Sequence, residues 1–355
     1  MKHILVTGGA GFVGSNLAIN LKKHFGENCR IVCLDNLKRR GSELNISRLN
    51  GFGIEFVHGD IRNIEDFEAI DKVDLILECS AEPSVLAGYN SSPAYLVQTN
   101  LQGTINCLEI ARTWDADFIF LSTSRVYPIK TINCLNLEEQ ESRFVISDQQ
   151  SISGISPKGI SEAFPLEGVR SLYGATKLCS EYIIQEYIDM YGIRGVINRC
   201  GVLTGPWQMG KVDQGVVVLW IARHIYGGSL SYFGYGGTGK QVRDILDVED
   251  LATLVLNQYG NLDKHNNVIY NVGGGNEVSI SLKELTELCQ QATGNSISIS
   301  AVQEDRVADI PYYITDNTKI TKTSGWTPQK KPVEIVENIT RWIRDNLETL
   351  KPLLG

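Results

Sequence analysis

The sequence predicts an α/β fold in which helices cover both faces of a parallel sheet, with a smaller mixed α/β lobe in the C-terminal half. Over the first 200 of the 355 residues, short apolar runs alternate with segments of helical spacing, which is typical of a parallel sheet. Beyond residue 200 the pattern changes to a glycine-rich stretch at 227–239, short strands and amphipathic helices. The strand-like runs of the first half lie at 3–7, 31–35, 54–57, 74–79, 117–122 and 194–199.

A glycine-rich turn follows the first strand-like run. Residues 4–7 are mostly apolar and rich in β-forming side chains, as in a strand buried on both faces. Gly8, Gly11 and Gly14 come next, and a helical pattern that includes Leu17 follows. In such a turn the backbone N–H groups and the positive end of the helix dipole point toward a pyrophosphate, and glycines let it come close. We therefore expect a Rossmann-like, doubly wound sheet that binds a dinucleotide at this turn.

Asp35 ends the second strand-like run, about 20 residues beyond the last glycine, where an acidic residue binds the adenosine ribose. A carboxylate accepts a hydrogen bond from the ribose 2′-hydroxyl but repels a 2′-phosphate, which favours NAD over NADP. Lys38, Arg39 and Arg40 follow closely and could instead bind a 2′-phosphate. Asp35 lies at the better-defined position, so we expect NAD as the cofactor.

We expect two domains. An NAD-binding domain covers residues 1–200, and a substrate-binding lobe covers most of 201–355, with some segments returning to the first sheet. Residues 128–170 are polar and indicate an inserted loop region, of the kind that often forms a lid or a binding loop. Helical spacing is present at 100–114, 173–191, 281–293 and 332–349.

Composition and charge exclude several classes of function. The net charge is −8 and the sequence has no dense basic run, so we do not expect nucleic-acid binding. The apolar stretches are too short to span a membrane, and the chain begins directly with a core strand, so we expect no signal peptide. The eight cysteines form no Cys-x-x-Cys pair, which favours reduced thiols in the cytoplasm and no bound metal.

Tyr173 and Lys177 are four residues apart in a predicted helix, which places both side chains on one face. A phenol has a pKa of about 10, too high for a base at neutral pH. The nearby ammonium, together with a cationic nicotinamide ring, is expected to favour the phenolate and lower that pKa. The strand-like run at 117–122 leads into further hydroxyl side chains, among them Thr123. We therefore expect a site in which Tyr173 acts as a base.

The Gly-x-x-Gly-x-x-Gly spacing, the Tyr-x-x-x-Lys pair and the hydroxyl-rich strand end resemble the extended short-chain dehydrogenase/reductases, specifically the NAD-dependent nucleotide-sugar epimerase/dehydratase family. The resemblance implies a catalytic triad of Thr123, Tyr173 and Lys177, in which Thr123 hydrogen-bonds the reacting sugar oxygen. It also implies a homodimer or homotetramer, because helices comparable to 100–114 and 173–191 form the dimer interface in that family. The cofactor-binding residues that it implies are Gly8, Gly11, Phe12, Val13, Asp35, Asn36, Asp60, Ile61, Ala81, Asn100, Tyr173 and Lys177.

The C-terminal half resembles the substrate-binding lobe of the same family. In the segment 237–244, Arg243 matches an arginine that meets the nucleotide pyrophosphate, as suits a guanidinium fork. Arg306 and Asp309 resemble a second Arg–Asp pair near the nucleotide, and an ordinary surface ion pair is the alternative in both places. The substrate-binding residues that the resemblance implies are Glu82, Ser124, Arg125, Gln208, Gln214, Lys240, Gln241, Arg243, Arg306 and Asp309.

Within this family, several segments resemble the CDP-paratose 2-epimerases, and the likeness runs from Lys2 to about Trp342. The segments lie at 34–41, 55–63, 212–215 and 239–244. The resemblance implies C2 epimerisation of a CDP-sugar by transient oxidation to a 2-keto sugar and re-reduction on the opposite face. It is weakest over 128–170, and Pro128 stands where the family usually has glycine, so we expect an altered sugar pocket.

Three alternatives stay open from the sequence. A UDP-sugar 4-epimerase uses the same triad with the sugar turned differently. The related 4,6-dehydratases have Asp-Glu directly after the catalytic threonine, whereas Ser124 and Arg125 stand there in this chain, which argues against elimination of water. A non-catalytic NAD-binding regulator would keep the glycine turn and lose the triad.

Overall fold

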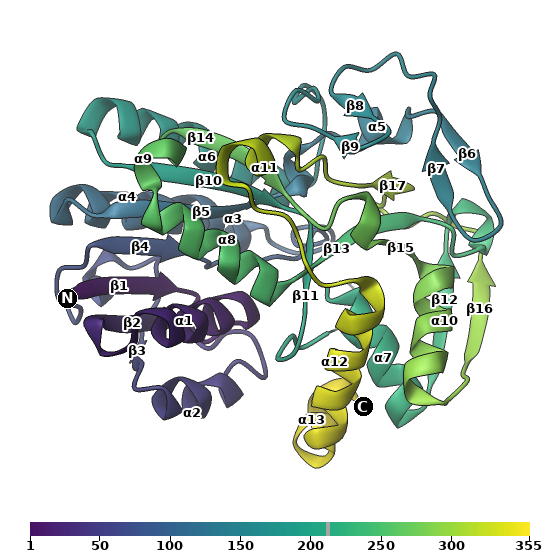
Figure 1. Cartoon of the computed structure of the whole chain (residues 1–355), viewed down its shortest axis with the longest axis horizontal. Helices are drawn as coiled ribbons and strands as arrows, with labels where there is room; N and C mark the ends of the chain where they lie inside the picture. Colours follow the sequence, from purple (N-terminus) through teal and green to yellow (C-terminus); the bar gives the residue numbers. More distant parts are fainter. Residues whose placement is uncertain (211–213) are drawn as a thin grey trace.

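The computed structural model describes residues 1–210 and 214–355, and seven parallel strands form its main sheet (Figure 1). They are β1 (Lys2–Thr7), β2 (Cys29–Asp35), β3 (Glu55–His58), β4 (Leu75–Glu78), β5 (Asp117–Thr123), β10 (Gly195–Cys200) and β14 (Val268–Val272). Their order in the sheet is β14-β10-β5-β4-β1-β2-β3. The chain changes direction across the sheet between β1 and β4, which makes that point the switch point of a doubly wound fold. The predicted Rossmann-like fold is confirmed.

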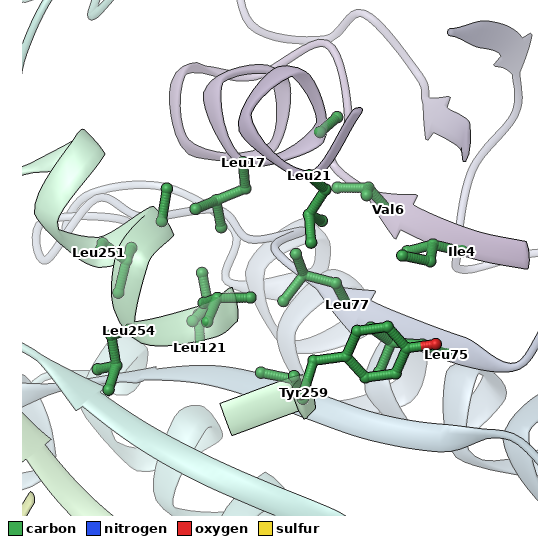
Figure 2. Packing of buried hydrophobic residues seen from close by; sticks show 14 of the residues in the cluster. Ile4, Val6, Leu17, Leu21, Leu75, Leu77, Leu121, Leu251, Leu254 and Tyr259 are labelled. Atoms are coloured by element: carbon green, nitrogen blue, oxygen red, sulfur yellow. The ribbon is translucent and has the colours of Figure 1, made fainter. Parts of the chain in front are cut away.

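Helices pack on both faces of this sheet. They are α1 (Phe12–Phe25) and α8 (Val248–Gly260) on one face, and α4 (Gly103–Trp114) and α6 (Leu172–Tyr191) on the other. Figure 2 shows Leu17 of α1 and Leu251 of α8 pointing into the same cluster as Leu77 of β4. On the opposite face, Leu108 of α4 and Ile184 of α6 belong to a second buried cluster. The strands are therefore buried on both sides, which explains their continuous apolar runs.

The helix predicted at 100–114 begins earlier than expected. It consists of α3 (Ala94–Val97), a π-helical turn η3 (Gln98–Gln102) and then α4. Pro93 is the N-cap of α3, and a proline without an N–H group is compatible with a helix start. Asn100 consequently lies inside the helical segment rather than at its beginning, which corrects the sequence expectation.

The C-terminal half forms a smaller mixed lobe and also returns to the main sheet, to which it contributes β14, α8 and α11 (Thr318–Ser324). In the lobe, α7 (Val216–Tyr226), α10 (Leu282–Thr293), α12 (Pro332–Asp345) and α13 (Leu347–Leu354) share one buried cluster. The helix expected at 332–349 is interrupted at Asn346, whose backbone is not helical. The remaining elements of the second half are β11 (Val202–Thr204), β12 (Ser229–Phe233), η5 (Tyr235–Gly237), β13 (Val242–Asp247), α9 (Leu262–His265), η6 (Asn276–Val278), β15 (Ser279–Ser281), β16 (Ser298–Val302) and β17 (Tyr312–Tyr313).

Residues 128–170 contain short elements rather than one irregular loop. They are α5 (Ile129–Asn133) and two hairpins, β6 (Leu137–Glu139) with β7 (Phe144–Ile146) and β8 (Ile155–Ser156) with β9 (Gly159–Ile160). Apolar residues of this segment, such as Ile132 and Phe164, pack with Tyr313 of β17. Strands of two or three residues are too short to produce a periodic pattern in the sequence. In the first half, the remaining helices are α2 (Leu44–Gly51) and the 3₁₀ turns η1 (Gly26–Asn28) and η2 (Ile64–Phe67). Among the described residues, no helix combines the length and apolar character that a membrane crossing requires.

Candidate functional site

The turn after β1 has the geometry of an anion site. Gly8 has a φ of +63°, in the left-handed region that favours glycine. A Cβ at Gly14 would lie 2.3 Å from the carbonyl oxygen of Gly8, so a side chain there would push α1 away from the turn. Gly11 is the N-cap of α1, and the backbone N–H groups of a first helical turn have no intrahelical acceptor. Those of Phe12 and Val13 are thus available to a phosphate.

Asp35 lies beside this turn at the end of β2. Its carboxylate accepts hydrogen bonds from the backbone N–H of Ala10 at 3.1 Å and of Leu37 at 2.8 Å. Burial raises the pKa of Asp35, and these hydrogen bonds lower it. The amide of Asn36 donates to Asp60 at 2.8 Å, so the structure brings together the strand-end residues that the sequence predicted near the adenosine.

The basic residues after Asp35 contact protein groups. Arg39 donates to the carbonyl oxygen of Met209 at 2.6 Å and also to the side chain of Gln214. Arg40 donates to the carbonyl oxygen of Pro352 at 3.0 Å. Both arginines therefore connect the end of β2 to the second half of the chain, which supports the reading of Asp35 as the selector of NAD.

Thr123, Tyr173 and Lys177 come together at the carboxyl edge of the sheet. Ser171 caps α6 by accepting from the backbone N–H of Gly174 at 3.2 Å, which places Tyr173 in the first turn. A Cβ at Gly174 would lie 2.0 Å from the carbonyl oxygen of Arg125, so glycine allows α6 to approach the end of β5. The phenol of Tyr173 lies close enough to the hydroxyl of Thr123 for this hydroxyl to influence the phenol's pKa. One helical turn further on, the Lys177 ammonium lies 3.9 Å from the centre of the Phe120 ring.

The electrostatics of the tyrosine differ from the sequence expectation. Burial raises the pKa of Tyr173 to about 12, and the nearby Thr123 hydroxyl opposes this increase. Burial also lowers the pKa of Lys177, while the Glu78 carboxylate raises it. The prediction of a lowered phenol pKa is therefore wrong for the protein without its cofactor. Burial raises the pKa of Tyr173 by more than the positive charge of Arg125 lowers it.

Arg125 lies near this tyrosine, and Arg243 lies near Arg125. Burial and, to a smaller extent, the neighbouring Arg243 lower the pKa of the Arg125 guanidinium to about 10, although Asp309 and Tyr173 act in the opposite direction. Arg243 pairs with Asp309 at 2.8 Å. The expected Arg306–Asp309 pair is thus corrected, because Asp309 binds Arg243 and Arg306 lies 3.8 Å from the centre of the Phe233 ring.

Asn100 orders the turn that follows β4. Its side chain accepts from the backbone N–H of Glu82 at 2.8 Å, donates to the Glu82 carbonyl oxygen at 3.1 Å and donates to Thr176 at 3.4 Å. The turn containing Ala81 is thereby joined to α6. The carbonyl oxygen of Ile61 accepts from Asn106 of α4 at 2.8 Å, so the ends of β3 and β4 are both tied to the same helical segment.

Other predicted substrate residues have protein partners of their own. Lys240 pairs with Glu139 at 2.7 Å, and Gln241 donates to the carbonyl oxygen of Phe233 at 3.1 Å. Gln208 donates to the Leu203 carbonyl oxygen at 2.9 Å, within its own loop. Ser124 begins the 3₁₀ turn η4 (Ser124–Val126) directly after Thr123. Within the segment 212–215, Val212 and Asp213 lie outside the described residues.

Sequence reasoning missed Glu78. This residue ends β4, its side chain is fully buried, and one of its carboxylate oxygens lies 3.9 Å from the Lys177 Nζ. The available signal was an acidic residue at the end of the wholly apolar run Leu75–Leu77, since a buried carboxylate needs a partner.

Comparison with known proteins gives one family. The profile described as "NAD dependent epimerase/dehydratase family" matches residues 4–273. CDP-paratose 2-epimerase of Salmonella typhi is 30% identical over 346 residues, which cover 96% of this chain and 98% of that protein. A putative UDP-glucose 4-epimerase of Methanocaldococcus jannaschii is 29% identical and covers 98% of this chain and 100% of its own. A solved dTDP-glucose 4,6-dehydratase of Streptomyces venezuelae with NAD bound has a TM-score of 0.79 at 25% identity, and the alignment covers 99% of this chain and 100% of the other.

Proposed function

Because the chain belongs to the NAD-dependent epimerase/dehydratase family, we propose that it is an isomerase that inverts C2 of a nucleotide-activated sugar, with a CDP-sugar of the paratose type as substrate. The observation that carries this proposal is the contact of Tyr173 with Thr123 at the end of β5, followed by Ser124 and Arg125. This arrangement provides a base and a hydroxyl partner for a sugar oxygen. It lacks the acidic pair that the resembling dehydratases use to expel water.

The cofactor is NAD, and the residues present fit it. The left-handed backbone of Gly8 and the close approach at Gly14 leave space at the start of α1 for a pyrophosphate. Asp35 stands where a ribose 2′-hydroxyl can donate to it. When bound, NAD supplies a hydride acceptor that returns the hydride within one catalytic cycle.

The chain's own residues handle the proton. With a pKa of about 12, Tyr173 is neutral at pH 7 in the protein alone. Positive charge from Lys177 and from the oxidised cofactor must therefore favour its phenolate before it can accept the proton of a sugar hydroxyl. Thr123 is placed to hold the same sugar oxygen, so that the proton moves over a fixed path from that oxygen to the phenol.

Arg125 and Arg243 support an anionic substrate. The two guanidinium groups repel each other, and Asp309 balances Arg243 through their ion pair. A diphosphate would supply further negative charge and accept the paired N–H donors of a guanidinium. Preference for CDP rests on the likeness to CDP-paratose 2-epimerase.

The decisive experiment follows the hydride. A CDP-paratose-type substrate deuterated at C2 is incubated with the enzyme, and the product is analysed by NMR. Transient C2 oxidation predicts inversion at C2 with the label retained at C2, because the hydride stays on the bound cofactor. Inversion with loss of the label to solvent contradicts the mechanism and indicates proton abstraction next to a carbonyl group.

A second candidate, a UDP-sugar 4-epimerase, is favoured by the likeness to the putative UDP-glucose 4-epimerase. The same assay separates the two functions when CDP-, UDP- and GDP-sugars are compared. Inversion at C4 of a UDP-sugar, with no change at C2, selects this candidate. A complete lack of turnover on all three sugar series favours the non-catalytic regulator.

We also propose a homodimer built on α4 and α6. Tyr182, Met190 and Tyr191 of α6 are exposed, with Met190 65% accessible, and a partner helix pair would cover them. Light scattering of the purified protein distinguishes a monomer from a dimer or tetramer. The eight free cysteines are consistent with a cytoplasmic enzyme.

A further inference from the structure

Glu78 and Lys177 form a buried pair of charges. The side chain of Glu78 is 0% exposed and that of Lys177 is 2% exposed, and their Oε2 and Nζ atoms lie 3.9 Å apart. The hydroxyl of Thr104 donates to the same carboxylate oxygen at 3.4 Å. The other oxygen, Oε1, has no hydrogen-bond partner among the described residues.

The pair occupies the switch point of the sheet. Glu78 is the last residue of β4 and lies in register with Thr7 of β1 and with Phe120 of β5. It therefore stands between the strand that leads into the glycine turn and the strand that ends at Thr123. A carboxylate in this apolar layer is unfavourable unless an opposite charge lies close to it.

The separation matters for the chemistry. At 3.9 Å the attraction between the two charges is strong in a buried site, yet the distance exceeds that of a normal hydrogen bond. Glu78 can thus stabilise the ammonium without taking up its N–H donors. Those donors are left to a ligand that binds next to Tyr173.

We propose that Glu78 is the counter-ion of Lys177: a positioning residue that keeps the buried ammonium charged at the carboxyl edge of the sheet. The inference rests on the proposed role of Lys177 in the triad. It adds to that role the group that maintains the charge on Lys177.

Other titratable groups face the pair. Glu181 of α6 and the thiols of Cys79 and Cys200 act on Lys177. The Cys107 thiol is influenced by both Glu78 and Lys177 and so also lies near the pair. Glu181 is already paired with Arg199 at 2.6 Å, and burial raises the pKa of each of these thiols, so they are neutral at pH 7. Glu78 is therefore the nearby carboxylate whose charge Lys177 balances.

The test measures the protonation of Lys177 directly in the full-length protein without substrate. Lysine labelled with ¹³C at Cε is titrated by NMR, and the Lys177 resonance is identified by its loss in Lys177→Met. We expect Glu78→Gln to weaken proton binding at Lys177 at least tenfold, a fall of about one pH unit in the midpoint. Thr104→Val, which removes the hydroxyl partner and keeps the carboxylate, is the matched control and should leave the midpoint almost unchanged.

Activity supplies a second reading. In Glu78→Gln, kcat should fall most at alkaline pH, where Lys177 loses its proton, while KM for the nucleotide sugar stays near the native value. A merely structural role for Glu78 would lower the melting temperature and leave the Lys177 midpoint in place. That outcome in a folded Glu78→Gln protein overturns the proposal.

If Glu78→Gln does not fold, the native protein still decides the question. The ¹³C signal of the Glu78 side-chain carboxyl group, assigned by comparison with Glu78→Asp, should show that Glu78 is ionised at pH 7. A protonated Glu78 carries no charge, so it could not act as a counter-ion, and this result would refute the proposal. Neither NMR measurement involves turnover, so a failed label experiment would argue against the proposed reaction and leave this result intact.

Discussion

The glycine turn and the Arg243 region are built in different ways. At the turn, the backbone carries the site: Gly8 has a φ of +63°, and Gly14 approaches the Gly8 carbonyl oxygen too closely for a side chain. In the Arg243 region, side chains carry it: Arg243 pairs with Asp309, and Arg125 donates to the Ala308 carbonyl oxygen at 3.2 Å. The first region draws on one short stretch of chain, whereas the second joins segments that are far apart in the sequence.

The difference shows why one fold can serve many substrates. A turn at the end of a parallel strand positions N–H groups by chain geometry, so it needs glycines at fixed spacing and little else. A pocket built from distant side chains depends on which partner each side chain finds. Its specificity can change without disturbing the sheet. The following substitutions test whether cofactor choice depends on the glycine turn, substrate affinity on the Arg243 region, and turnover on the residues between them.

The largest effect is expected for Tyr173→Phe, which removes the proposed proton acceptor between the two regions. Turnover should fall by about 10²- to 10⁴-fold, the usual contribution of a general base, while NAD binding and the melting temperature stay near native. Tyr259→Phe is the control and should be neutral, because Tyr259 lies next to Lys2 at the start of β1, at the other end of the sheet. Steady-state kinetics measures the turnover of both variants, at a temperature at which their melting curves show them to be fully folded. Native turnover in Tyr173→Phe would refute the triad.

Arg243→Ala should raise KM for the nucleotide sugar by about 10- to 100-fold, because a guanidinium–phosphate contact is a charge-assisted hydrogen bond. NAD affinity should not change, since Arg243 belongs to the side-chain-built region. Asp309→Asn distinguishes a substrate-binding role of Arg243 from a structural one, because it breaks the Arg243–Asp309 ion pair but keeps the guanidinium. Equal increases in KM for both variants would mean that Arg243 acts only as the ion-pair partner of Asp309.

The same division explains what could be read from the sequence. Six of the seven strands of the main sheet follow from strand periodicity, whereas β14 (Val268–Val272) was expected only in general terms, as a segment of the second half that returns to the sheet. The contact of Tyr173 with Thr123 follows from short motifs and from the family that they resemble. The Arg243–Asp309 pair was not predicted, because a pairing between distant segments leaves no spacing signal in one sequence. The raised pKa of Tyr173 was missed for a similar reason: burial depends on how the lobe and α6 close around the phenol.

Asp35→Ala tests the backbone-built region. We expect about a tenfold loss of NAD affinity, the scale of one hydrogen bond to a charged group, and a narrower preference for NAD over NADP, because the repulsion of a 2′-phosphate is removed. Fluorescence titration with both cofactors gives the ratio. Lys38→Ala is the companion variant: its ammonium lies 4.7 Å from the centre of the Tyr95 ring. A preference that changes in Lys38→Ala and not in Asp35→Ala would assign cofactor choice to the basic run.

The smallest effect is expected for Lys240→Ala, and it tests how far the side-chain-built region extends. Lys240 was predicted to contact substrate, yet its ammonium pairs with Glu139, whose side chain is 58% exposed. An ion pair with one partner in solvent contributes about 0–1 kcal/mol to stability, so melting should hardly change. If Lys240 serves only to hold the β6–β7 hairpin, KM for the nucleotide sugar should stay within about twofold of the native value. The same is expected for Glu139→Gln. A change of about twofold in KM corresponds to a free energy much smaller than that of one hydrogen bond. A tenfold rise in KM for Lys240→Ala with a native KM in Glu139→Gln would instead place Lys240 in the substrate site together with Arg243.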